Sequence, residues 1–111
     1  MLKFDNISIW VHDQDEALAF YTDMLGFEVR FDITIASGFR WLEIALPDHD
    51  TGLVLGAIPG GAPMDAATEQ QLRSIVGKGL SGTILLTTED CFAEAERLRA
   101  RGVEFIQEPT D

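Results

Sequence analysis

The stretch that decides the fold runs over Ile7–Phe27 and reads ISIWVHDQDEALAFYTDMLGF. Over Ile7–Val11 apolar residues alternate with others, a period of two that predicts a β-strand with two different faces. Asp13 then stands where a helix N-cap belongs, and Glu16 follows three residues later, as in a capping box. Apolar residues at helical spacing continue to Gly26, which is free to adopt the positive φ of a helix C-terminus. The stretch therefore predicts a strand followed by a helix.

Three further strands are expected in the first half of the chain. Alternating residues over Phe27–Ile33 and Phe39–Leu46 indicate two of them, with Phe27, Val29, Phe31 and Ile33 on one face of the first. The short apolar run Leu53–Ile58 indicates a third, after a turn cluster at 47–52. Residues 1–58 are thus expected to form one β-α-β-β-β module.

The second half repeats the beginning of this pattern. Residues 59–80 are expected to form a linker with a short helix, because Pro and Gly dominate its start and Asp65 can cap a helix that Gly77 ends. Residues 81–111 then show a strand over Thr83–Thr88, a helix capped by Asp90 and a strand over Val103–Gln107. An internal repeat of this kind indicates two copies of one unit, the second lacking its last two strands.

The repeated residues resemble the vicinal-oxygen-chelate superfamily, which includes glyoxalases, bleomycin resistance proteins and dioxygenases. The likeness lies in the opening strand up to Asp13, in Ala19-Phe20-Tyr21 and in Leu25-Gly26-Phe27, and again in Arg101-Gly102-Val103 and Glu108-Pro109. The resemblance implies an α+β fold of paired βαβββ modules, spanning residues 1–111 as a single domain, whose sheets form a cup.

The resemblance also implies where metal ligands would stand. Metal-binding relatives carry His at the positions of Asn6 and Thr83, and usually Glu within the segment that here is Gly52–Gly56. None of these side chains is a ligand for a divalent transition metal, which needs about three from His, Cys, Asp or Glu. We therefore expect no metal and no other cofactor. His12 and His49 are expected to be solvated surface residues.

Composition restricts the partners. Among 111 residues, 19 acidic and 8 basic side chains give a formal charge of −11. That charge repels nucleic acid and anionic lipid and suits cationic compounds. The single cysteine, Cys91, excludes an internal disulfide and is expected to be a buried small hydrophobe. The N-terminal residues lack the pattern of a secretory signal, so a soluble cytoplasmic protein is expected.

Strand alternation predicts which side chains line the cup. If Ile7, Ile9 and Val11 pack under the helices, the alternate residues of each strand point to the opposite face. We expect a ligand-binding surface formed by Asn6, Ser8, Trp10, Trp41, Glu43, Thr83 and Leu85. The tryptophans can stack on a planar ligand, and Glu43 can pair with a cation or act as a base, although no catalytic residue is established. The alternative is that both tryptophans are partly buried core or dimer-interface residues and that Glu43 is solvated.

Three hypotheses about function follow. The first is a metal-free protein that binds a small aromatic or cationic molecule. The second is a metal-dependent lyase or dioxygenase with unorthodox ligands such as Glu43. The third is a non-catalytic dimerisation module. A homodimer is expected in each case, because the short second module would leave strand edges unpaired.

Overall fold

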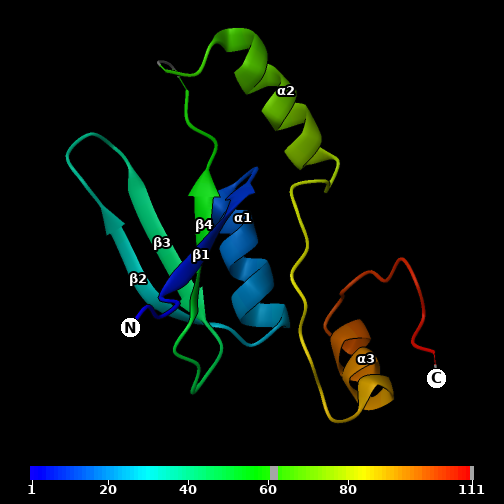
Figure 1. Ribbon diagram of the computed structural model, residues 1–111. Helices are drawn as coiled ribbons and strands as arrows, with labels where there is room; N and C mark the ends of the chain where they lie inside the picture. Colours follow the sequence, from blue (N-terminus) through cyan, green and yellow to red (C-terminus); the bar gives the residue numbers. More distant parts are fainter. Residues whose placement is uncertain (61–62, 111) are drawn as a thin grey trace.

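The computed structural model describes residues 1–60 and 63–110. Its elements follow one another along the chain as shown in Figure 1. They are β1 (Asn6–Val11), α1 (Gln14–Ala19), the π-helical segment η1 (Phe20–Met24), β2 (Glu28–Thr34), β3 (Arg40–Ala45), β4 (Gly52–Ala57), α2 (Ala66–Gly77) and α3 (Cys91–Ala100). The predicted β-α-β-β-β order of the first half is confirmed.

The four strands form one mixed sheet in the order β1-β4-β3-β2. β1 pairs with β4 in parallel, whereas β4 with β3 and β3 with β2 are antiparallel. One face of this sheet packs with residues of α1 and η1 around a cluster of buried apolar side chains, namely Val11, Phe27, Leu42, Ile44, Leu53 and Leu55. Ile7 was expected on this covered face but is half exposed, because β1 is an edge strand and the sheet covers it on one side only. The fold class is α+β, as predicted.

Aspartates begin all three α-helices. The side chains of Asp13, Asp65 and Asp90 accept hydrogen bonds from the backbone N–H of Glu16, Thr68 and Ala93, at 3.0, 2.7 and 3.0 Å respectively. Each bond satisfies an N–H that has no partner within its helix. The bond from Thr68 holds the pKa of Asp65 below its usual value. The three caps predicted from the sequence are confirmed.

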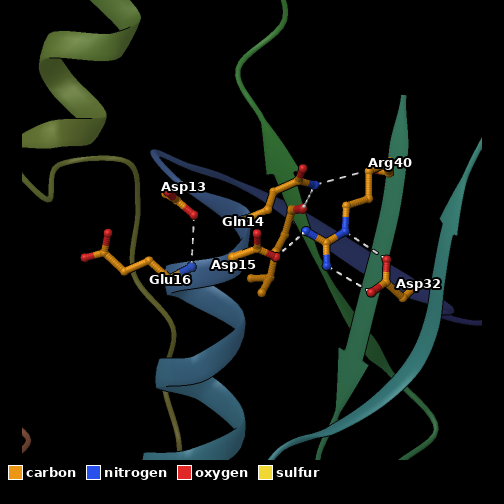
Figure 2. Close-up of polar contacts among 7 residues, drawn as sticks. Asp13, Gln14, Asp15, Glu16, Asp32 and Arg40 are labelled. Atoms are coloured by element: carbon orange, nitrogen blue, oxygen red, sulfur yellow. Dashed lines mark hydrogen bonds and ion pairs between the residues drawn. The ribbon is translucent and has the colours of Figure 1, made fainter. Parts of the chain in front are cut away.

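The start of α1 is joined to the sheet by a polar cluster (Figure 2). The Gln14 side-chain amide donates to the carbonyl oxygens of Leu55, at 2.9 Å, and Arg40, at 3.3 Å. These two carbonyls belong to β4 and β3, so one side chain serves both strands. Arg40 in turn bonds to Asp15 at 2.7 Å and to both carboxylate oxygens of Asp32, at 2.8 and 2.9 Å. The hydrogen bond from Arg40 lowers the pKa of Asp32, and the two aspartates raise that of Arg40.

After α1 the chain continues as the π-helical segment η1, in which Tyr21 packs against the hydrophobic core. The Tyr21 ring meets Phe20 and Phe27 edge-on, with ring centroids 5.3 Å apart in both pairs. Burial raises the pKa of its hydroxyl. A π-helical insertion changes the direction of the side chains that follow it, which the regular apolar spacing of the sequence does not reveal.

The predicted strands of the second half are absent. Neither Thr83–Thr88 nor Val103–Gln107 has strand structure, and Figure 1 draws both as plain trace on either side of α3. Backbone in extended form becomes a strand only when a neighbour supplies its hydrogen bonds, and neither segment pairs with the sheet or with the other. The helix between them forms as predicted, and Gly102 ends it at a φ of +97°.

The chain is correspondingly extended. Its radius of gyration is 15.9 Å, whereas a compact domain of this length has about 13 Å. Large apolar side chains of the second half are exposed, among them Leu80, Leu85, Leu86, Phe92 and Ile106. Within the described residues, no helix is both long and apolar enough to cross a membrane.

Candidate functional site

The sheet face opposite α1 brings the predicted site residues of the first module together. Strand register pairs Ser8 with Val54, Trp10 with Gly56, and Glu43 with Val54, and paired residues point to the same side of a sheet. We call this surface the cup face. It comprises Asn6, Ser8, Trp10, Arg30, Phe31, Ile33, Trp41, Glu43, Gly52, Val54 and Gly56.

A β-bulge in β2 changes which of its residues reach the cup face. The register shifts between Val29 and Phe31, so that Val29 pairs with Ile44 while Phe31 pairs with Glu43. The expectation that Val29 and Phe31 share a face is therefore wrong. In a bulge of this type two residues oppose one, so both Arg30 and Phe31 lie across from Glu43. Alternation from Val29 already points Arg30 to the cup face, and the bulge brings the apolar residue Phe31 onto the same face beside it.

Glu43 is a buried charged residue at the middle of the cup face. It is 2% exposed, so the alternative that it is a solvated surface carboxylate is wrong. The Trp41 indole N–H donates to its Oε1 at 3.2 Å, and Arg30 Nε lies 3.2 Å from its Oε2. The Arg30 contact has ion-pair distance but not hydrogen-bond geometry, so Oε2 is a buried acceptor without a hydrogen-bonding partner among the described residues.

Gly52 makes room for this carboxylate. A Cβ atom at position 52 would lie 2.5 Å from Glu43 Oε2 and 2.9 Å from both Cδ and Cγ of the same side chain. Real Cβ contacts are not that short, so Glu43 lies across β4 only because residue 52 has no side chain. The sequence marks Gly52 only as a position that cannot bind metal, and this packing role depends on a residue of another strand.

Two tryptophans stand at one end of the cup face. Trp10 is 40% exposed, and its ring lies beside Gly56, where an added Cβ would be 3.5 Å from the indole. Trp41 precedes Glu43 by two residues on β3 and is partly exposed. Phe31 and Ile33 of β2, 48% and 52% exposed, extend this apolar surface. An exposed aromatic group around a single buried ion pair is the mixture typical of a small-molecule site.

A polar hollow lies at the other end. It has a volume of about 350 Å³ and is lined by Lys3, Asp5, Glu28, Arg30, Asp48 and Asp50, among others. Arg30 joins the two ends, because its Nε faces Glu43 while its Nη1 donates to the Asp50 carbonyl oxygen at 2.6 Å. Arg30 was not among the predicted site residues, although its alternation with Val29 points it to the cup face.

Thr83 and Leu85 do not join this surface within the described chain. Both are exposed, Leu85 to 89%, in the segment that the structure leaves unpaired. The expected surface histidines, His12 and His49, are exposed. Cys91 is exposed as well, so the expectation of a buried cysteine is wrong. It begins α3, and the strands that would cover it are not formed.

The acidic residues do not assemble into a metal site. Among residues 1–60 and 63–110, no three side chains from His, Cys, Asp and Glu lie close enough to hold an ion together. The three positions that the resemblance implies hold Asn6, Thr83 and the Gly52–Gly56 segment, which supply no ligand for a divalent transition metal. The donor set of this chain therefore does not fit the metal that such a fold carries in its metal-dependent members.

A second hollow lies beside α3. Its volume is about 360 Å³, and its wall is mostly apolar, with Leu25 and Leu46 from the first half facing Leu86, Leu98 and Phe105 from the second. Cys91 is at its border. It lacks the buried charged pair and the tryptophans of the cup face, which makes it the matched comparison for any binding experiment.

Comparisons with known proteins agree with this architecture. A family model described as the Glyoxalase/Bleomycin resistance protein/Dioxygenase superfamily matches residues 3–111. The uncharacterized protein YurT of Bacillus subtilis is 41% identical over 109 residues, which cover 98% of this chain and 82% of that protein. The crystal structure of UcmS2 has a TM-score of 0.89 at 40% identity, covering 100% of this chain and 83% of that one. TnmS3, an antibiotic binding protein from Streptomyces sp. CB03234, has a TM-score of 0.65 at 30% identity, covering 94% and 74%.

Proposed function

Because the chain belongs to the glyoxalase/bleomycin resistance protein/dioxygenase superfamily, we propose that it binds a small planar molecule on the cup face without using a metal. The observation that carries the proposal is the exposed aromatic surface of Trp10, Trp41 and Phe31 around the buried Glu43. The similarity to TnmS3, which is described as an antibiotic binding protein, supports binding rather than turnover.

The aromatic surface is the basis for the ligand class. Indole rings contribute large contact area at small entropic cost, and offset stacking on a planar ligand adds to area burial. A cationic ligand was the other expectation, but Glu43 is already paired with Arg30 and almost fully covered. A ligand cation would have to displace Arg30 to reach it. The net charge of −11 can still raise the local concentration of cationic compounds at long range.

We predict that protein purified without chelator holds far less than one equivalent of zinc, nickel, manganese or iron. Its implied ligand positions carry Asn6, Thr83 and the Gly52–Gly56 segment, and a divalent site needs about three ligating side chains. Elemental analysis by mass spectrometry checks this directly. Near-stoichiometric metal that is lost in Glu43→Gln would instead establish the second hypothesis, a metal-dependent lyase or dioxygenase with an unorthodox ligand.

We predict that Trp10→Ala weakens binding of a planar aromatic compound by about 1–3 kcal/mol if its ring stacks on the ligand. Quenching of tryptophan emission during titration measures the affinity. Phe92→Ala is the matched control, because Phe92 is also an exposed aromatic residue but lies on α3. Equal losses in both variants would contradict a site on the cup face.

We also propose that two copies associate. The second half exposes Leu85, Leu86 and Ile106, and within the part of the chain that the structure describes its segments 83–88 and 103–107 pair with no strand. Segments of this kind pair readily with an unpaired strand edge, and β1 and β2 are the edges of the sheet.

An exposed free thiol at Cys91 is also consistent with the reducing cytoplasm, where we place the protein.

Light scattering over a concentration series tests the association. We expect the mass of a dimer throughout the micromolar range, and protection of the amides of 83–88 from hydrogen exchange that is lost on dilution to monomer. A stable monomer with protected amides in the same segment would show that the second module closes on itself.

A further inference from the structure

We propose that Arg30 is the polar recognition group of the cup face and that it binds a neutral carbonyl or amide oxygen of the ligand. The inference rests on the proposed function, because it concerns the same ligand surface. It starts from Arg30, which lies across from Glu43 at the bulge in β2, with its Nε 3.2 Å from the Glu43 carboxylate.

The guanidinium is held on two sides. Its Nε lies 3.2 Å from Glu43 Oε2, and its Nη1 donates to the Asp50 carbonyl oxygen at 2.6 Å. Glu43 is itself fixed, since Trp41 donates to its Oε1 and the absence of a side chain at Gly52 gives it its place. A cation held in this way has lost most of its rotational freedom before any ligand arrives, so a ligand that bonds to it bears less of the ordering cost.

The same geometry leaves donors available. A guanidinium carries five N–H groups, and among the described residues the bond to Asp50 is the one hydrogen bond that the Arg30 side chain makes. The Glu43 contact is an ion pair without hydrogen-bond alignment. The Arg30 side chain is 30% exposed and borders the polar hollow of about 350 Å³. Its remaining donors have no protein acceptor among the described residues, and a ligand in the hollow can replace water as their partner.

The surroundings select the charge of that acceptor. Asp5, Glu28, Asp48 and Asp50 also line the hollow, against the cations Lys3 and Arg30. This excess of carboxylates opposes a full negative charge, whereas a neutral carbonyl or amide oxygen accepts from Arg30 without that repulsion. An ammonium group on the ligand has no oxygen to accept a hydrogen bond from Arg30, and its positive charge would be repelled by the guanidinium.

The spacing fits one ligand that reaches both ends. Two residues along a strand span about 7 Å, which separates Trp41 from Glu43 on the same face of β3. A bicyclic aromatic ring over the tryptophans with a carbonyl substituent directed toward Arg30 matches this distance. The proposed ligand is therefore a planar aromatic compound with a neutral acceptor oxygen at one end.

Three naphthalene probes test the inference by calorimetric titration. 2-Acetonaphthone and 2-isopropenylnaphthalene have the same shape and no charge, and they differ only in that an oxygen replaces a CH₂ group. 2-Naphthylmethylammonium carries a cation in the same place. We expect the ketone to bind about tenfold more tightly than the alkene, the effect of one hydrogen bond to a charged donor. The ammonium compound should bind no better than the alkene.

The variant that tests Arg30 is the double substitution Arg30→Met/Glu43→Gln, which removes both charges, leaves no unpaired charge buried and leaves no hydrogen-bond donor on the side chain at position 30. It should abolish the preference for the ketone over the alkene. Arg97→Met on α3 should retain the preference.

Each other outcome has a defined meaning. Equal affinities of ketone and alkene for the unmodified protein, or a retained preference in the double variant, would overturn the role of Arg30 but leave an aromatic site. A preference for the ammonium probe would overturn it in favour of Glu43. If none of the three probes binds at millimolar concentration, the proposed function itself fails, and the role of Arg30 fails with it.

Discussion

Gly52→Ala should destabilise the protein by about 2–4 kcal/mol, more than an alanine substitution at any other glycine in the sheet. The new Cβ would lie 2.5 Å from Glu43 Oε2 and 2.9 Å from Glu43 Cγ. The carboxylate cannot simply move outward, because the residue is 2% exposed and is held by Trp41 and Arg30. Either the ion pair or the spacing of β3 and β4 has to change. Urea denaturation followed by circular dichroism measures the loss.

Two further variants show whether the contact with Glu43 is the cause. Gly77 is the last residue of α2, and nothing lies within 4 Å of a Cβ atom added there. Gly77→Ala should therefore leave stability unchanged or raise it slightly. In the Glu43→Ala background the cost of Gly52→Ala should largely disappear, because the clashing atoms are gone. An unchanged cost in that background would show that the effect comes from β4 itself, and unaltered stability of Gly52→Ala alone would contradict the packing described above.

Arg30→Met should cost about 2–3 kcal/mol of stability, somewhat less than breaking a fully buried ion pair, because the Arg30 side chain is 30% exposed. The substitution keeps a long apolar side chain but leaves Glu43 as a buried charge with no cation beside it. The penalty comes from that stranded carboxylate rather than from the lost attraction. Adding Glu43→Gln should therefore recover most of the stability, and the four proteins form a double-mutant cycle in urea.

An exposed ion pair provides the control for this cycle. Arg97 pairs with Glu94 on the surface of α3, with a side-chain exposure of 43% for the arginine. Arg97→Met should change stability by less than about 1 kcal/mol. If Arg30→Met is no more costly than Arg97→Met, then Glu43 is not a buried charge that depends on Arg30.

The first module could be predicted almost completely from local patterns. Alternation, aspartate caps and turn residues specify its strands and helices, because each of these signals acts over a few residues. The same reasoning placed Asn6, Ser8, Trp10, Trp41 and Glu43 on one face, which the strand register bears out.

What could not be predicted depends on contacts between distant residues. The bulge in β2 interrupts an alternation that is continuous in the sequence, and it turns Phe31 and Ile33 to the cup face, where they pair with Glu43 and Trp41. Position 52 requires glycine because the Glu43 side chain of β3 occupies the space that a Cβ atom would need. The strands expected at Thr83–Thr88 and Val103–Gln107 fail for a similar reason, since strand propensity does not supply a partner.

Nuclear magnetic resonance of the ¹⁵N-labelled protein titrated with 2-acetonaphthone shows whether the cup face holds the ligand. We expect the indole N–H signals of Trp10 and Trp41 and the amides of Glu43 and Gly56 to shift together and to saturate at one equivalent per chain. The amides around the second hollow, at Leu86, Cys91 and Phe105, should not move. Saturable shifts confined to that hollow, with both indole signals unchanged, would show that the ligand binds there and not on the cup face.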